Sequence, residues 1–497
     1  MKKSTTYKII CIITAFSLAV FCFSCDFPMG NSIKDDAGSR DGYKADPVKN
    51  ASDTPEESIG SVGPAAYDYL ESLNVKTFGG SELRIAAFDD EYFLTSGLTD
   101  LIHSAVDERN ALCESKLGIK IVGADVSHTS LNDYYEKLCA EYYANSDFCE
   151  LVIMPYSLMD AFIAQNMLLN MNTLPFTDYT APYYDHKAMA SVTPGTFAYA
   201  AIGDYTYSPD KIWCVFYNKD LCAKLGLKDP SELFNSGAWN WDMVKTYSKT
   251  ARDAGYYGFT TNTDDTTFCD VIWASSDITT IENEPPYPPV MNFKNDTTNS
   301  VMKLISSLIV DNNAFLSESR RGDKEGADYF KQGRCLFYIY KASAVSFLDS
   351  YDFTAGALPM PKCYSDQAEY SGYVDRSTQA VFVLNNCMNT DLAGSALQVL
   401  SAASYGKLSD VFMKICMNYY LPDNDSALIM KQIISNAYYD AGYMLGGKAL
   451  KEFGDASFEM IRSKVLFNLD FNELYKANIT AFNERYSVRN LFVIKRQ

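Results

Sequence analysis

Short continuous apolar runs alternate with longer amphipathic segments along the first part of the chain. Leu83–Phe88, Ile119–Val122 and Leu151–Met154 are apolar throughout or nearly so, as is typical of buried strands. Between them, Leu98–Leu117 and Leu131–Tyr143 carry apolar residues at helical spacing. Strands that alternate with helices in this way predict parallel β-α-β units, and therefore an α/β fold.

A second strand-and-helix region begins at Ile212. Ile212–Tyr217 has the pattern of a buried strand, and Asn218 interrupts it before a helical segment. Asp229 followed by Pro230 predicts a new helix, with the carboxylate as its cap, and Asn240 predicts the cap of a third. Since 497 residues are too many for one hydrophobic core, we expect two lobes.

Several motifs in this region occur in a fixed order and spacing. They are Tyr217–Leu221 (YNKDL), Gly226-Leu227, Asp229-Pro230, Trp239–Asp242 (W-x-W-D), Phe330, Gly333 and Phe337 (F-x-x-G-x-x-x-F), and Leu358, Pro359, Pro361 and Lys362 (L-P-x-P-K). In these motifs the chain resembles family 1 extracellular solute-binding proteins, the binding subunits of ATP-driven sugar importers. The resemblance covers about Leu83 to Tyr486 and is weakest in the last hundred residues.

The resemblance implies a two-lobed periplasmic-binding-protein-like fold of type II, in which each lobe is a mainly parallel sheet flanked by helices. The implied divisions are 79–195 for the first part of lobe one, 196–375 for lobe two, 376–408 for the return to lobe one, and 409–497 for C-terminal helices, mostly of lobe two. The chain is expected to cross between lobes near Pro194–Asp204, Tyr373–Thr378 and Tyr405–Val411. The implied mechanism is hinge closure around a ligand.

The N-terminus has the pattern of a secretory leader. In Met1–Ser24, three lysines precede a mostly apolar stretch that is short for a spanning helix, which predicts a signal peptide over 1–24. The Ser24-Cys25 step resembles a lipoprotein cleavage site, so we expect acylation, with palmitate among the chains, at Cys25. Because Cys22 stands where the pattern has Leu, Val or Ile, ordinary cleavage and an uncleaved anchor remain alternatives.

Residues 25–78 read as a flexible tether attached to this lipid anchor. They are rich in Asp, Gly, Ser, Pro and Lys and carry few aromatic residues, so they cannot bury enough surface to fold. Ala65–Leu73 is the exception, since it follows Pro64 and has the pattern of a short helix.

Charge and composition exclude several classes of partner and chemistry. A formal net charge of −19 disfavours nucleic acid and anionic lipid headgroups as direct partners. With 3 histidines and 13 scattered cysteines, we expect no metal site, while one or two disulfides remain possible. No phosphate-binding or dinucleotide-binding glycine loop and no G-x-S-x-G elbow is present, so we expect neither a cofactor nor an enzyme.

A carbohydrate site needs aromatic faces and a few hydrogen-bonding groups, placed where parallel strands end. This rule selects Asp89, Asp90, Tyr92, Tyr156, Trp273 and Tyr340 as candidate ligand-binding residues, and Tyr373 and Arg376, before the strand that returns to lobe one, are two further candidates. For Tyr156, Trp273 and Tyr340 the alternative is a place in the core, for Asp89 a solvated loop, and for Arg376 an ion pair. Trp213, Trp239 and Trp241 are assigned to packing.

Together these features predict an extracytoplasmic lipoprotein on the outer face of the cytoplasmic membrane. We expect a monomer that captures a carbohydrate, specifically an oligosaccharide, and delivers it to the permease subunits of an ABC transporter. Two alternatives stay open: a structural or adhesive surface lipoprotein of the same fold, and a secreted glycosidase whose acids would be drawn from Asp89, Asp90 and Glu91.

Overall fold

The computed structural model describes residues 65–94, 100–206, 209–291, 293, 295–310, 315–316, 326–417, 421, 424–444 and 456–485. Every described residue belongs to one compact unit, which spans Val62–Gln497. The predictions for the signal peptide, for Cys25 and for most of the tether lie outside the described residues.

A four-stranded sheet forms the centre of lobe one and follows the predicted β-α-β pattern. Its strand order is β12-β3-β1-β2, with bounds β1 Ser81–Ala87, β2 Ile119–Gly123, β3 Leu151–Pro155 and β12 Gln379–Phe382. β1 pairs in parallel with both β2 and β3, and β12 is antiparallel to β3. All five residues of β3 are buried, as its continuous apolar pattern predicts.

The helices of lobe one begin and end at recognisable sequence signals. Their bounds are α2 Ala65–Ser72, α3 Leu101–Leu117, α4 Leu131–Tyr143, η1 Tyr156–Leu158, α5 Met159–Ala164, η2 Met171–Thr173, α6 His186–Ser191 and α14 Thr390–Ser404. The Asp100 carboxylate accepts the Ile102 and His103 N–H groups at the start of α3. α3 ends at Gly118, whose φ of 64° lies in the left-handed region that glycine adopts at little cost.

The short helix expected inside the tether is present as α2. It packs against α14, and Leu70 is buried there. The packed body therefore begins before Ser81, and the predicted tether extends too far toward the body.

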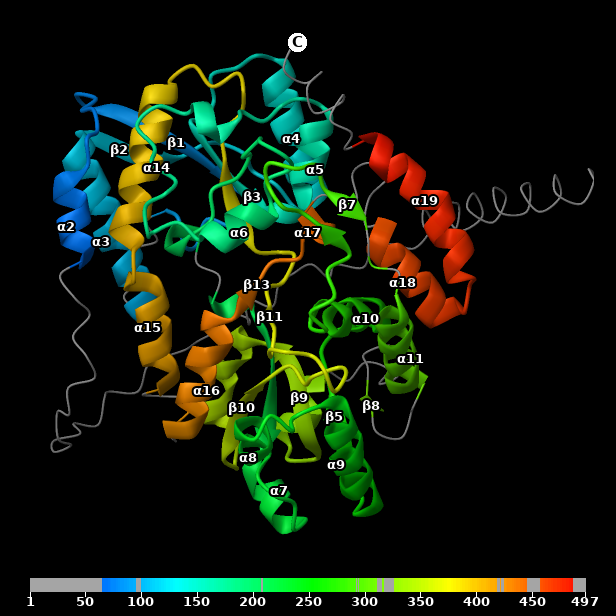
Figure 1. The fold of residues 1–497 in the computed structure, drawn as a ribbon. Coiled ribbons are helices and arrows are strands. Elements are labelled where there is room, and N and C mark those ends of the chain that lie inside the picture. The colour runs from blue at the N-terminus through cyan, green and yellow to red at the C-terminus, as the bar shows by residue number, and fades with distance from the viewer. Residues whose placement is uncertain are drawn as a thin grey trace, which may run out of the picture. The chain divides into compact units, whose positions relative to one another are not determined.

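A five-stranded sheet forms the centre of lobe two. Its order is β10-β4-β9-β5-β8, with bounds β4 Trp213–Asn218, β5 Tyr257–Thr260, β8 Phe315–Leu316, β9 Cys335–Lys341 and β10 Ala355–Pro359. β5 runs parallel to β8 and β9, whereas β4 is antiparallel to β9 and β10. The two sheets occupy different parts of the ribbon in Figure 1.

The predicted caps at Asp229 and Asn240 are confirmed, and Asn218 forms a further cap that was not predicted. Its helical elements are η3 Asp204–Thr206, η4 Pro209–Lys211, α7 Lys219–Lys224, α8 Pro230–Asn235, α9 Trp241–Asp253, α10 Asp265–Ala274, α11 Asp296–Val310, α13 Gly326–Lys331 and η5 Ala342–Ser350. The side chains of Asn218, Asp229 and Asn240 each accept a backbone N–H at the start of α7, α8 and α9.

The last hundred residues add helices and small strands to both lobes. Their bounds are α15 Lys407–Ile415, α16 Asn424–Ser435, β13 Ala437–Tyr438, α17 Ala441–Met444, α18 Ala456–Phe467 and α19 Phe471–Arg485, and three further short strands are β6 Ile281–Glu282, β7 Val290–Met291 and β11 Gly372–Tyr373. α15 packs on α3, α16 on β10, and α18 on α10 and α11.

Among the described residues, three hydrogen-bonded segments lie between the lobes, and we call them the linking segments: 202–206 with 209–212, 372–378 and 436–440. Ile212 bridges Val374, and β11 pairs in parallel with β13, so each segment is hydrogen-bonded to the next. Ala201 still pairs with Val381 of the lobe-one sheet, so within the predicted Pro194–Asp204 crossing the chain leaves this sheet only after Ala201. The crossing expected at Tyr405–Val411 stays a prediction; that stretch enters α15, which packs on α3 of lobe one, and the next helix, α16, packs on β10 of lobe two.

Candidate ligand-binding site

The loop after β1 presents three of the predicted residues and is held rigidly by lobe one. Asp89 is half-buried and Asp90 is exposed. The Asp89 N–H donates to Gln379 Oε1 (3.4 Å), and Gln379 Nε2 donates back to the Asp89 carbonyl (3.2 Å). Buried Arg109 of α3 donates from Nη2 to the Tyr92 carbonyl at 3.0 Å. The backbone behind the candidate side chains is therefore fixed from two elements.

The end of β9 presents an aromatic ring and a cation. Tyr340 is half-buried, and its ring meets Trp213 edge to face with centroids 5.5 Å apart. Trp213 is buried, as its assignment to packing expected, and its indole N–H donates to the Asp375 carboxylate at 2.9 Å. Lys341, the residue after Tyr340, is almost fully buried. Lobe two thus places a π-face and charged groups next to a linking segment.

Electrostatic interactions connect these groups. Burial raises the pKa of Asp210, and Lys211 and Lys341 partly offset this effect while Asp89 adds to it. Burial opposes ionisation of Asp375, but Lys341 and hydrogen bonds from Ser377 and Trp213 leave its pKa below the ordinary value.

Tyr92 belongs to the same set of interacting groups. Burial raises its pKa, and the charge of Asp210 raises it further. We call these groups the strand-end cluster: Asp89, Tyr92, Asp210, Trp213, Tyr340, Lys341 and Asp375. The cluster draws on the loop after β1, two linking segments and the end of β9.

Two other predicted residues lie behind this cluster. Tyr156 is fully buried and donates from its hydroxyl to the Val374 carbonyl at 3.2 Å. Its side chain also hydrogen-bonds with buried Tyr373. Both rings therefore pack where a linking segment meets lobe one, which agrees with the core alternative for Tyr156. Arg376, one residue after Asp375, is half-buried in the same linking segment.

The placement of Trp273 at a strand end is wrong. The residue lies inside α10 with no exposed surface, and its ring packs against Phe293 with centroids 5.9 Å apart. The physical reason is that α10 packs on both α11 and α18. Residues 268–274 of the helix are therefore buried, and no side of the helix faces solvent at Trp273.

Sequence reasoning missed Asp210, Lys341 and Asp375. Each is next to, or within a few residues of, a position that the strand-end rule or the crossing prediction selected. In lobe two the strand-end rule selects aromatic residues only. Lys341 directly follows Tyr340, so a rule that also admitted the next charged residue would include it.

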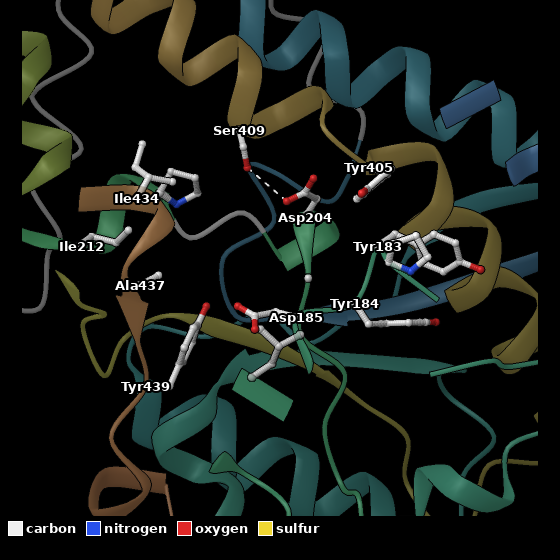
Figure 2. Close-up of a pocket in the computed structure, with 14 residues that line it drawn as sticks. Tyr183, Tyr184, Asp185, Asp204, Ile212, Tyr405, Ser409, Ile434, Ala437 and Tyr439 are labelled. Atoms are coloured by element: carbon white, nitrogen blue, oxygen red, sulfur yellow. Dashed lines mark hydrogen bonds between the residues drawn. The ribbon is translucent and has the colours of Figure 1, made fainter. Parts of the chain in front are cut away.

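A separate cavity of about 200 Å³ lies beside the linking segments. Its lining residues are Pro182, Tyr183, Tyr184, Asp185, Ile202, Gly203, Asp204, Pro209, Ile212, Tyr405, Ser409, Ile434, Ala437 and Tyr439 (Figure 2). None of the eight predicted ligand-binding residues lines it, although Tyr439 contacts Tyr156 with ring centroids 5.9 Å apart. The cavity and the strand-end cluster are thus neighbouring but distinct.

Metal-binding groups, thiols and membrane-spanning helices are the remaining features to consider in the part of the chain that the structure describes. No group of three or more His, Cys, Asp or Glu residues there is placed to hold a metal ion. Ten cysteines within the described ranges have free thiols. No helix among the described residues is both long and apolar enough to cross a membrane.

No protein-family model and no curated protein sequence matches the chain, but many solved structures share its fold. The sugar-binding protein MalE from Xanthomonas citri aligns with a TM-score of 0.55 at 12% identity, over 84% of this chain and 100% of that protein. The galacto-N-biose-/lacto-N-biose I-binding protein of an ABC transporter from Bifidobacterium longum aligns at 0.54 and 15% identity, over 84% and 98%.

A family 1 extracellular solute-binding protein from Bifidobacterium longum subsp. infantis aligns at 0.53 and 13% identity, over 82% and 100%. The chain therefore has the two-lobed α/β fold of family 1 extracellular solute-binding proteins, as its sequence motifs indicate.

Proposed function

We propose that this protein is an extracytoplasmic solute-binding protein that captures a carbohydrate, specifically an oligosaccharide, and performs no catalysis on it. The observation that carries the proposal is the strand-end cluster. It brings a ring and a carboxylate from the end of a lobe-one strand together with a ring and a cation from the end of a lobe-two strand. This is the set of groups that a sugar requires.

The residues of the cluster match the two kinds of surface on a sugar. The half-buried rings of Tyr92 and Tyr340 offer π-faces to the apolar C–H faces of pyranose units. The carboxylate of Asp89, and that of exposed Asp90 next to the cluster, would accept hydrogen bonds from hydroxyl groups. Trp213 supports the site indirectly, since its ring packs against Tyr340 and its indole N–H donates to the Asp375 carboxylate.

The similar structures support an oligosaccharide as the ligand. One is described in complex with lacto-N-biose, and another, from Listeria monocytogenes with a TM-score of 0.50, in complex with cycloalternan. Those ligands belong to those proteins, and the shared fold suggests the same class of ligand for this chain.

Hinge closure follows from where the contacting groups lie. A ligand that touches both the loop after β1 and the end of β9 makes all its contacts only when the two lobes approach it together. Binding therefore favours the closed arrangement by the difference in contacts between the two arrangements.

We also propose that Cys25 carries the lipid anchor and that the protein acts as a monomer on the outer face of the cytoplasmic membrane. Two acyl chains give stable anchoring, whereas a single chain gives only marginal binding. The loaded protein then docks on the permease subunits of an ABC transporter and releases the sugar to them.

Thermal unfolding of the purified protein with a panel of oligosaccharides, peptides and polyamines tests the ligand class. At least one oligosaccharide should raise the unfolding temperature, and X-ray scattering with that sugar should show a smaller radius of gyration. Stabilisation by peptides or polyamines, with no response to any sugar, would refute the proposal.

A pair of tyrosine variants tests the location of the site. Tyr340→Ala should weaken sugar binding about 5- to 10-fold, because it removes a stacking face worth about 1–1.4 kcal/mol. Tyr143→Ala is the matched control, since Tyr143 lies 66% exposed on α4, outside the strand-end cluster. Equal affinities for the two variants would place the sugar elsewhere.

Metabolic labelling with palmitate tests the anchor. The wild-type chain should incorporate label and stay with the membrane, and Cys25→Ser should do neither. Label that persists in Cys25→Ser would show that another residue is acylated.

A further inference from the structure

The β6–β7 hairpin joins the two lobes at a place outside the linking segments. We call residues 281–291 the strap. Asn283, which follows β6, donates from Nδ2 to the carbonyls of Ala190, Ser191 and Thr193 at 2.9, 2.8 and 3.1 Å. These carbonyls lie at and just after the end of α6, a helix of lobe one. We propose that the strap holds the two lobes at one relative angle when no ligand is bound, and that it must release α6 before this angle changes.

The contact satisfies hydrogen-bonding groups that α6 leaves open. The last carbonyl groups of a helix have no N–H donor within the helix. The Asn283 amide supplies donors to them from the other lobe. Its orientation follows from this contact: among the described residues its buried Oδ1 has no hydrogen-bond donor, and a reversed amide would place Oδ1 against three carbonyl oxygens.

The strap is anchored to lobe two at its base. Ile281 and Met291 pair across the hairpin, and both side chains are buried. The Tyr475 hydroxyl of α19 donates to the Met291 carbonyl at 2.9 Å. Two residues further on, the Phe293 ring packs against Trp273 of α10, with centroids 5.9 Å apart. The strap therefore moves with α10 and α19.

The residue before the strap connects it to the third linking segment. Buried Thr280 donates from its hydroxyl to Asp440 Oδ1 at 3.5 Å and accepts from the Ser457 hydroxyl at 3.0 Å. A Cβ added at Gly442 would lie 2.1 Å from Thr280 Oγ1, so the groups around this hydroxyl are closely packed. A shift of the linking segment is therefore transmitted to the start of the strap.

The other partner, α6, is fixed within lobe one. The Asp185 carboxylate accepts the Ala188 N–H at 2.9 Å, and the Asp185 N–H donates to the Ile202 carbonyl at 2.9 Å. Ala188 and Met189 are buried on the inner side of the helix. Because both partners are fixed within their own lobes, rotation of one lobe against the other moves Asn283 away from the carbonyl groups and breaks its bonds.

Double electron-electron resonance on the unliganded full chain tests the proposal. Spin labels on unnatural amino acids in place of Lys120 of β2 and Lys249 of α9 report a distance between the lobes, and both positions are 67% exposed. The otherwise unaltered chain should give one narrow distance distribution, and a broad one would overturn the proposal. Since no sugar is added, the result does not depend on the proposed function.

Two variants of Asn283 then break the contact. Asn283→Asp keeps the shape of the side chain but sets a carboxylate against the carbonyl oxygens, and Asn283→Ala removes the donors without this repulsion. Loss of the bonds should raise the population of other inter-lobe angles about 10-fold, with the larger broadening in Asn283→Asp.

Asn478→Asp is the matched control. Asn478 Nδ2 also donates to a backbone carbonyl, that of Leu474 at 2.7 Å, but both residues lie within α19. This variant should leave the distance distribution unchanged. An unchanged distribution in both Asn283 variants, or equal broadening in Asn478→Asp, would overturn the proposal; near-ultraviolet circular dichroism equal to that of the unaltered chain confirms that each variant is folded.

Discussion

A buried ion pair fixes the C-terminal helix α18 to α10 of lobe two. Arg462 Nε donates to Asp270 Oδ1 at 2.7 Å, and Nη2 makes a second bond to Oδ2. The two side chains are only 8% and 2% exposed. We therefore predict that breaking the pair from either side strongly destabilises the protein.

The magnitude follows from burial. Removal of one partner leaves the other charge buried without compensation, which costs about 3–5 kcal/mol. Asp270→Asn keeps the shape of the side chain, and Arg462→Met keeps the apolar stem, so each single variant should lose about that much. The double variant leaves no unpaired charge. Its loss should be smaller than the sum of the single losses by at least about 2 kcal/mol.

Urea unfolding followed by near-ultraviolet circular dichroism measures these losses. Lys476→Met serves as the control, since it removes an exposed pair with Glu473, whose atoms are 3.2 Å apart and whose side chains are 68% and 73% exposed. That control should change stability by less than about 1 kcal/mol. Single losses below about 1 kcal/mol, or strictly additive losses in the double variant, would refute the reasoning.

Two further predictions concern single residues. Burial raises the pKa of Asp440 to about 6, so the folded protein binds a proton that the unfolded chain has released; stability should fall by roughly 2 kcal/mol as pH rises from about 4 to 6, and urea unfolding across this range should show a smaller fall in Asp440→Asn. In α14, a Cβ added at Gly394 would lie 1.8 Å from the Pro175 carbonyl oxygen, so Gly394→Ala should lose about 1–3 kcal/mol despite the better helix propensity of Ala, and an unchanged melting temperature would contradict this.

Local signals in the sequence predicted local structure well. The helix Leu131–Tyr143 has the bounds that its periodicity predicts, and the caps at Asp229 and Asn240 form as expected. Each depends on side chains within a few residues of one another, which the sequence displays directly.

Features that depend on packing between distant segments were harder to predict. The continuation of lobe one to Ala201 depends on pairing with Val381, 180 residues away in the chain. Trp273 and Tyr340 have similar apolar surroundings in the sequence. Trp273 is a core residue because α18 packs on α10, and the sequence does not display that contact. Similarly, Lys341 is a candidate because it interacts with Asp210 and Asp375, which lie far from it in the sequence.

The hydrogen bonds that join the linking segments have a consequence for the kinetics of capture. Because Ile212 bridges Val374 and β11 pairs with β13, the three connections bend as one ribbon, and twisting or sliding of one half past the other would break those bonds. If the lobes close on a ligand as proposed, these bonds favour rotation about the linking segments over sliding. Under the proposed function, a solute bound to one lobe would then meet the other lobe in a fixed orientation, and closure would cost little orientational entropy.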